Sequence, residues 1–187
     1  NSMFMVNTEG KRFVDESIAR NDLCGAIFAQ PNQIAYLISD LANSTLVDGV
    51  NAYGVSEESL INRGWLIRGE TIEELGEKMG LEEGVLTATV EQYNEAVLTG
   101  KDELFGRTLF VAGSDISMTE GPYYAFPIAP AVHITYGGIT ANEDLQVTRG
   151  DGTPIEGLYA GGEVVAYRSG ISNAMADGYR VISNLYD

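Results

Sequence analysis

The only histidine of the 187-residue chain, His133, lies in the stretch of residues 131–138, which ends in Gly137 and Gly138. Histidine has an ordinary pKa near neutrality, which suits it to binding an anion or to moving a proton. A pair of glycines lets the backbone approach a flat or anionic group, because no Cβ atom is in the way. This stretch is therefore a candidate site. The alternative is that His133 is a structural residue beside an apolar run.

A second candidate site lies near the C-terminus, where residues 157–163 read GLYAGGE. This pattern indicates a short hydrophobic strand, a turn at two glycines and then an acid. Ser172 and Asn173 follow, and they begin an expected helix over residues 174–186. A strand, a glycine turn and a helix N-terminus together form a natural cradle for an anion or a cofactor.

Short strands are expected along much of the chain, because brief apolar runs alternate with turn residues. These runs are residues 4–7 and 12–14, joined by a hairpin turn, then 34–38, 65–67 and 123–128, and finally 145–148 and 153–155, which flank the turn at 150–152. A helix is expected over residues 18–30, closed by Pro31. Residues 41–64 are ambiguous, although Ser56 has a residue type that often begins a helix.

Two helices with clearer signals lie between these strands. Thr71, with Glu74 three residues later, forms a capping-box pattern, and this helix is expected to end at Gly80. The next helix is expected to end at Gly100, and it carries one apolar stripe at helical spacing, made of Leu86, Val90, Tyr93 and Val97. The mixture of helices and strands predicts an α+β fold.

Composition narrows the classes of partner. The chain has 27 acidic and 11 basic residues, for a formal charge of −16. This charge argues against nucleic acid and against an anionic membrane surface, and it requires local cations for any anionic substrate. The single cysteine, Cys24, excludes an internal disulfide and a multi-cysteine metal site, so no metal is expected. No apolar run approaches the ~20 residues that span a bilayer.

Motifs spread over nearly the whole chain carry a further signal. They are VNTEGKRFVDE (6–16), TIEEL (71–75), YN (93–94), GKD (100–102), FGR (105–107), APAVHITYGG (129–138) and GLYAGGE (157–163). In this order they resemble the soluble fumarate reductases and flavocytochromes c, within the fumarate reductase/succinate dehydrogenase flavoprotein group.

The resemblance implies a division of the chain into two parts. Residues 1–130 would be most of the capping (substrate) domain, and residues 131–187 the C-terminal strands and helix of the FAD-binding domain. The family's Gly-x-Gly-x-x-Gly turn and its second substrate-binding histidine have no counterpart in this sequence. We therefore expect the C-terminal portion of a longer flavoenzyme, whose missing N-terminal FAD domain is a required partner.

The cofactor implied by the resemblance is FAD in the full-length parent; whether this chain alone retains FAD is left open. The implied cofactor contacts are Thr135, Gly137, Gly138, Gly161, Gly162, Glu163, Ser172 and Asn173. His133 would hold a carboxylate of a small unsaturated substrate through a charge-assisted hydrogen bond.

The resemblance also implies a proton donor, Arg107, in the FGR segment. In the family, flavin N5 passes a hydride to one carbon of an activated C=C bond and an arginine protonates its neighbour. A guanidinium holds its proton strongly, so it can donate only if a relay replaces that proton. The family's relay partners lie upstream of residue 1, so we expect this chain alone to be inactive. The alternative for Arg107 is a solvated loop arginine.

The sequence around Arg168 differs from that of the family, so the identity of the substrate stays open. The family's HGANRLGGNA, whose arginine clamps a carboxylate, corresponds here to VAYRSGISNA at residues 165–174. The histidine is absent and the arginine lies one residue further from the Asn-Ala pair. Tyr136 replaces a methionine. Fumarate is therefore one possible substrate, and another unsaturated acid, as in urocanate reductases, is a second.

Two further readings of the function remain. One is a flavoenzyme acting on a neutral enone, like the ketosteroid dehydrogenases; the other is a non-catalytic cap or interaction domain. The expected location is the cytoplasm or periplasm of a bacterium, and the single Cys24 favours the cytoplasm.

Overall fold

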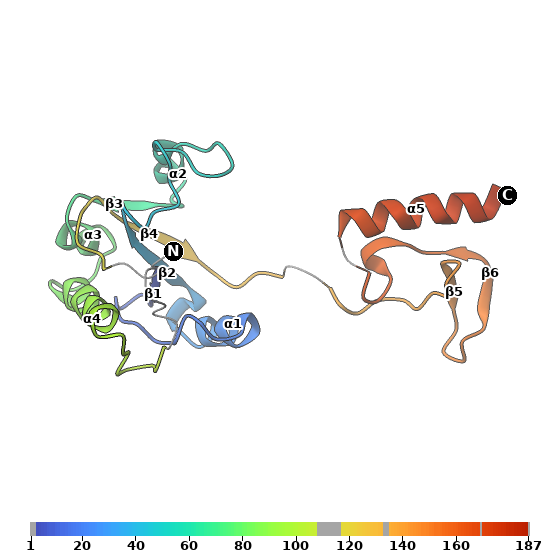
Figure 1. Cartoon of the computed structure of the whole chain (residues 1–187), viewed down its shortest axis with the longest axis horizontal. Coiled ribbons are helices and arrows are strands. Elements are labelled where there is room, and N and C mark those ends of the chain that lie inside the picture. The colour runs from blue at the N-terminus through green and yellow to red at the C-terminus, as the bar shows by residue number, and fades with distance from the viewer. Residues whose placement is uncertain (1–2, 108–116, 133–134, 169, 187) are drawn as a thin grey trace. The chain divides into compact units, whose positions relative to one another are not determined.

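The computed structural model describes residues 3–107, 117–132, 135–168 and 170–186. Contacts within the chain divide it into two compact units, Asn1–Pro130 and Ala131–Asp187 (Figure 1). Both units contain helices and strands, which is the α+β content expected from the sequence. The assignment of the first unit to a capping domain and of the second to an FAD-binding domain stays a prediction. None of the helices in the described ranges is long and apolar enough to cross a membrane.

A four-stranded antiparallel sheet organises the first unit. Its strands, in spatial order, are β1 (Phe4–Val6), β2 (Ala35–Asp40), β4 (Tyr123–Ile128) and β3 (Ile67–Gly69). The central pair, β2 and β4, is in register along its length, with Ile38 opposite Ala125. Apolar and aromatic residues fit such a pleated, buried surface. The strands expected near residues 34–38 and at 123–128 are confirmed, whereas of residues 65–67 only Ile67 lies in a strand.

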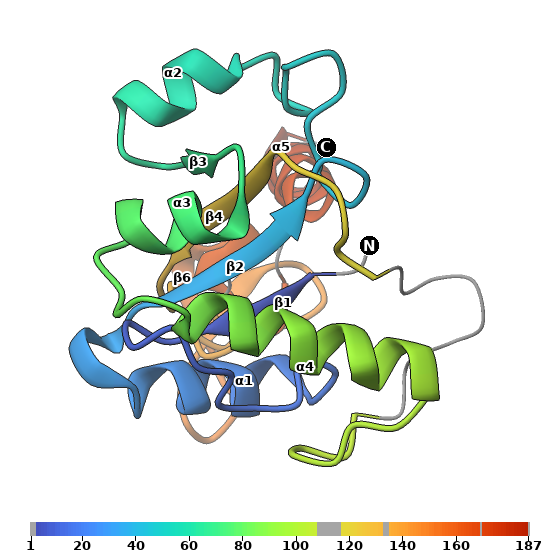
Figure 2. The ribbon, with the colours of Figure 1, turned by 90° about the vertical axis from the view of Figure 1, so that its left-hand side faces the viewer.

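Helices α3 (Ile72–Lys78) and α4 (Val85–Thr99) cover one face of this sheet (Figure 2). The core between them is formed by side chains from both layers: Phe4, Val6, Ile38, Ala125, Ile72, Leu75, Leu86, Val90, Tyr93 and Met118. The rings of Phe4 and Tyr93 stack with their centroids 4.5 Å apart. The apolar stripe expected on the second helix is therefore its buried face.

The ends of α3 and α4 follow local sequence signals. The Thr71 hydroxyl accepts the Glu74 N–H at 3.2 Å, and the Glu74 carboxylate accepts the Glu70 N–H at 2.7 Å. Gly100 ends α4 with a φ of 68°, a left-handed conformation that glycine adopts at little cost. Both predicted boundaries are confirmed.

The opposite face of the sheet is covered by α1 (Arg20–Phe28), which the short helix η1 (Pro31–Gln33) follows, and by α2 (Glu57–Asn62). Met5 and Ala35 pack against Ile27 of α1. Tyr124 packs in a second cluster with Leu46, Leu60 and Leu66. Because side chains alternate along a strand, Phe4 and Met5 of β1 serve opposite faces.

Residues 12–14 form no strand, so the hairpin expected there is wrong. A turn does follow β1, where the Gly10 N–H donates to the Asn7 carbonyl at 3.0 Å. The chain then leaves the sheet because the Arg12 side chain is buried in ion pairs. The helix expected over residues 18–30 is also shorter, because Asp15 forms a separate turn just before it.

The second unit is smaller. It contains the hairpin of β5 (Gln146–Thr148) and β6 (Pro154–Tyr159), the short helix η2 (Gly162–Val164) and α5 (Ile171–Tyr186). The hairpin and the final helix are confirmed, although α5 begins at Ile171 and so already includes Ser172 and Asn173, which were expected to precede it. Among the described residues of this unit, the buried hydrophobic side chains are those of Leu145, Val147 and Val165.

Candidate functional site

Arg107 lies in the loop that follows α4 and points into the protein. The residue is 8 % exposed, and its Nη1 lies 3.2 Å from Oε2 of Glu16 and 3.4 Å from the carbonyl oxygen of Met3. Arg107 is therefore not the solvated loop arginine considered in the sequence analysis. It is part of a buried ion pair.

Glu16 joins Arg107 to a larger group, which we call the ion cluster: Arg12, Glu16, Asp102 and Arg107. Glu16 accepts from Arg12 at 3.1 Å (Nε) and 2.9 Å (Nη2), and Nη2 of Arg12 also lies 2.9 Å from Oδ2 of Asp102. The four side chains are between 1 % and 9 % exposed. The cluster joins segments that are 90 and 91 residues apart in sequence.

The electrostatics of the cluster favour the charged forms of Arg12 and Asp102. Burial lowers the pKa of Arg12, but its hydrogen bonds to Glu16 and Asp102 outweigh burial, so the net pKa is raised. Burial raises the pKa of Asp102, but the hydrogen bond and charge of Arg12, with the N–H groups of Leu104 and Phe105, leave the net pKa lowered. Each group thus favours the ionised form of its partner.

Sequence reasoning missed a second arginine of this unit, Arg20. It is the first residue of α1 and is exposed, and the described part of the chain gives it no ion pair, hydrogen bond or ring contact. Arg63, another exposed arginine of the first unit, lies over the ring of Trp65 at 5.0 Å. A cation in the first turn opposes the helix dipole. That unfavourable position is the signal that could have identified Arg20.

Arg168, in the second unit, is paired with Asp177 of α5. Its Nε donates to Oδ2 at 2.8 Å and its Nη2 donates to Oδ1. Asp177 is 1 % exposed and also accepts the Gly162 N–H at 2.8 Å. The hydrogen bond from Arg168 outweighs burial, so the pKa of Asp177 is lowered. One edge of the Arg168 guanidinium is therefore committed, although its side chain remains 38 % exposed.

The glycine turns are shaped by close packing within the unit. A Cβ on Gly161 would lie 2.6 Å from Cβ of Asp177, and one on Gly138 would lie 2.4 Å from the carbonyl oxygen of Val164. At Gly137, by contrast, an added Cβ would meet no heavy atom within 4 Å. Glu163 accepts the N–H of Thr135 at 3.0 Å, so it links the two glycine segments.

The residues present fit a flavin on two counts. A cavity of about 320 Å³ lies where the end of β6 and the turn at Gly161 meet α5. Ser172 and Asn173 stand in the exposed first turn of α5, where main-chain N–H groups favour a negatively charged or polar edge. His133, which is also a predicted site residue, lies outside the described residues.

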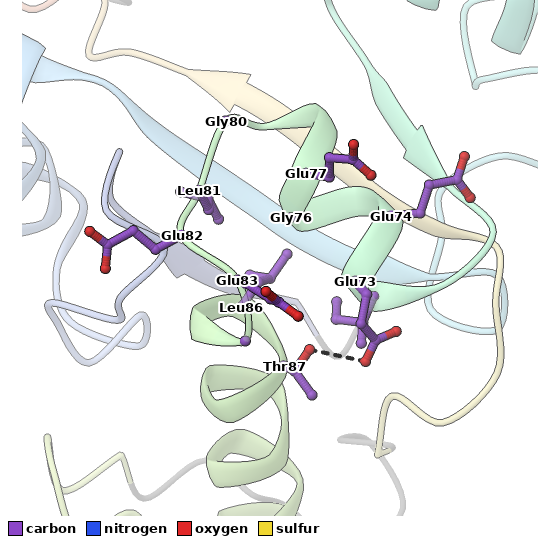
Figure 3. A pocket seen from close by; sticks show the side chains of 12 residues that line it. Glu73, Glu74, Gly76, Glu77, Gly80, Leu81, Glu82, Glu83, Leu86 and Thr87 are labelled. Carbon is purple, nitrogen blue, oxygen red and sulfur yellow. Dashed lines mark hydrogen bonds between the residues drawn. The ribbon is translucent and has the colours of Figure 1, made fainter.

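A further cavity, in the first unit, is lined by none of the predicted site residues. It has a volume of about 550 Å³ and lies between α3 and the start of α4 (Figure 3). Its charged lining residues are Glu73, Glu74, Glu77, Glu82 and Glu83. The pKa values of Glu73 and Glu74 are lowered by hydrogen bonds, so both are ionised at neutral pH. A cavity of this charge repels a carboxylate substrate.

Comparison with known proteins identifies what the chain is similar to. The family model described as FAD binding domain matches residues 1–178. An NADH:fumarate oxidoreductase of Klebsiella pneumoniae (strain 342) is 38 % identical over 177 residues, which are 92 % of this chain and 18 % of that protein. A urocanate reductase of Eggerthella lenta is 36 % identical over 172 residues, which are 91 % of this chain and 27 % of that protein.

A solved structure gives the same relationship in three dimensions. The open conformation of a flavocytochrome c3 fumarate reductase matches with a TM-score of 0.72 and 34 % identity, over 96 % of this chain and 31 % of that one. The chain thus spans between about a fifth and a third of the length of these relatives.

Proposed function

The chain belongs to the FAD binding domain family, and on that premise we propose that the protein containing it reduces the C=C bond of an unsaturated carboxylate. The observation that carries this proposal is similarity over about nine tenths of the chain to a fumarate oxidoreductase and to a urocanate reductase. Fumarate and urocanate are both carboxylates with a conjugated C=C bond. When bound, FAD would supply the hydride.

The second unit would contribute to holding the cofactor. The residues proposed for this are Thr135, Gly137, Gly138, Gly161, Gly162, Glu163, Ser172 and Asn173. The open backbone at Gly137 and the cavity beside Gly161 support these assignments. The first turn of α5 would stabilise negative charge on the part of the flavin that it faces.

The substrate carboxylate would be held by His133 and Arg168. A chain with a formal charge of −16 needs such local cations, since its overall field repels an anion. Asp177 occupies the Nε and Nη2 groups of Arg168, so only the Nη1 edge could meet a substrate. Asp177 would then hold the guanidinium in one orientation while that edge binds the carboxylate.

The proton would come from an arginine of the first unit. Arg107 is the candidate implied by family resemblance, and its burial with Glu16 limits its reach. Arg20 is a second candidate, because its side chain is exposed and the described residues offer it no partner. A positioned guanidinium would also stabilise the negative charge that develops on the substrate in the transition state.

Rapid mixing of the flavin-loaded whole protein with unsaturated acids tests the proposal. Reduced flavin is expected to be reoxidised by fumarate, urocanate or another enoate. The alanine variant of the donating arginine is expected to lower that rate by about 10²- to 10⁴-fold, the usual contribution of a general acid.

Arg107→Ala and Arg20→Ala would be compared with Arg63→Ala, an exposed arginine that contacts Trp65. Flavin that no enoate reoxidises would contradict the proposed reaction. Native rates in both arginine variants would leave the reaction intact but exclude these two donors.

A further inference from the structure

The segment that connects the turn after β1 to α1, residues 12–18, contains no helix or strand. Its described hydrogen bonds to the rest of the first unit pass through two side chains, those of Arg12 and Glu16. Arg12 reaches Asp102, and Glu16 reaches Arg107 and a main-chain N–H of β1. The course of this segment therefore depends on the ion cluster, together with the packing of Phe13 and Val14 in the core.

We propose that Glu16 and Arg107 are positioning residues for the reaction proposed above. Together they fix the path of residues 12–18, and so the first turn of α1, where Arg20 stands. This inference rests on the proposed function, because the position of that turn affects turnover only if a group in it meets the substrate. It gives Arg107 a task other than proton donation.

The contacts of Arg107 support a fixed guanidinium. The centres of the Arg107 and Arg12 guanidiniums lie 6.0 and 5.9 Å from the centroid of the Tyr93 ring. The Tyr93 side chain is itself fully buried in the core under Phe4. Two cations held beside one buried ring have little freedom to turn toward a substrate. These contacts therefore favour a positioning role for Arg107 over proton donation.

The charges of the ion cluster predict which of its residues can be substituted with the smaller loss of stability. Glu16 lies between the guanidiniums of Arg12 and Arg107 and accepts from both. Loss of Arg107 leaves Glu16 paired with Arg12. Loss of the Glu16 charge removes the carboxylate that Arg12 and Arg107 share, and a buried cation that loses such a partner is strongly destabilised. Variants of Arg107 are therefore the gentler test.

Hydrogen exchange in the flavin-loaded whole protein tests the positioning role without reference to turnover. Arg107→Ala is expected to speed exchange of the amides of residues 20–24 by about tenfold or more, because the turn that precedes them loses an anchor. Arg107→Lys, which can still pair with Glu16, is expected to restore native exchange. The matched control is Arg68→Ala, which removes a surface arginine paired with Glu57 and Glu70 in the same unit.

Steady-state kinetics with the best enoate provide the second readout. Arg107→Ala is expected to lower kcat by up to about 100-fold with KM nearly unchanged, as for a misplaced catalytic group. Arg107→Lys is expected to recover most of kcat. The double variant Arg107→Ala/Glu16→Gln is expected to be little worse than Glu16→Gln alone, since both residues act through one contact.

Native exchange at residues 20–24 in Arg107→Ala would overturn the positioning role, whatever the turnover. So would native exchange in Arg107→Lys together with turnover as low as in Arg107→Ala, because that combination indicates a proton donor. If the unsubstituted protein reduces no enoate, the proposed function fails, and the exchange experiment still decides whether the cluster positions α1.

Discussion

At the scale of single residues, partners decide what a charged group can do. Arg168 and Asp177 satisfy each other, and the main-chain N–H of Gly162 shares the same carboxylate. This arrangement depends on a close approach of the Asp177 side chain to the backbone at Gly161, since a side chain at Gly161 would collide with Asp177. The glycine is therefore required by packing as much as by any ligand.

Gly161→Ala is expected to destabilise the second unit by about 1–3 kcal/mol, the usual cost of overpacking. The added Cβ would lie 2.6 Å from Cβ of Asp177 and would displace the ion pair. The melting temperature and the flavin content of the whole protein are the measurements. Gly25→Ala in α1, where an added Cβ meets nothing within 4 Å, is the matched control and should be neutral or stabilising. Equal melting temperatures for the two variants would contradict the packing argument.

Asp102 makes stability depend on pH in a defined direction. Burial would raise its pKa, but the Arg12 hydrogen bond and charge outweigh burial and lower it below the ordinary value of 3.8. A carboxyl group with a lowered folded-state pKa stabilises the fold fully above its unfolded value, and this contribution is lost as pH falls through the folded value. The free energy of unfolding is therefore expected to fall as pH drops below about 4.

Denaturant unfolding between about pH 2.5 and about pH 7, which covers both sides of the expected change, measures this effect. Asp102→Asn should weaken the loss below about pH 4, because the neutral amide cannot titrate. The control is Asp48→Asn, at an exposed loop position with a φ of 51° that asparagine also adopts readily. A pH dependence that is the same in both variants would exclude Asp102 as its source.

At the scale of elements, local signals predicted boundaries well. Thr71 and Gly100 bound helices as expected, because a cap depends on residues three or four positions away. The ion cluster escaped prediction because Arg12 and Asp102 are 90 residues apart in sequence. The false strand at residues 12–14 has the same origin, since its β-favouring residues were read without knowledge of that long-range pairing.

The candidate site was predicted less completely than the fold. The sequence placed Arg168 in an anion clamp, but it gave no sign that Asp177, nine residues later, already holds one edge of the guanidinium. Arg107 was assigned from a three-residue resemblance, and burial is a property that such a short motif does not encode. The roles assigned to these arginines stay predictions.

Thr71→Ala is expected to destabilise the first unit by about 1 kcal/mol through loss of the cap on α3. The hydroxyl accepts the Glu74 N–H, which would lose that partner at the end of the helix. Thermal unfolding of the whole protein is the measurement, and Thr71→Ser, which keeps the hydroxyl, is the matched control. Unfolding of Thr71→Ala at the same temperature as Thr71→Ser would show that the cap contributes nothing.

At the scale of the whole molecule, acidic residues outnumber basic residues by 16. The glutamates around the cavity between α3 and α4 are one concentrated part of that excess (Figure 3). A dianion diffusing toward the protein experiences this repulsion at long range, well before it reaches an arginine. Dissolved salt shortens the range to about 10 Å at 0.1 M. Ionic strength thus governs how often such a dianion reaches the protein. Binding of the dianion after that encounter would depend on the few cations that lie close to it.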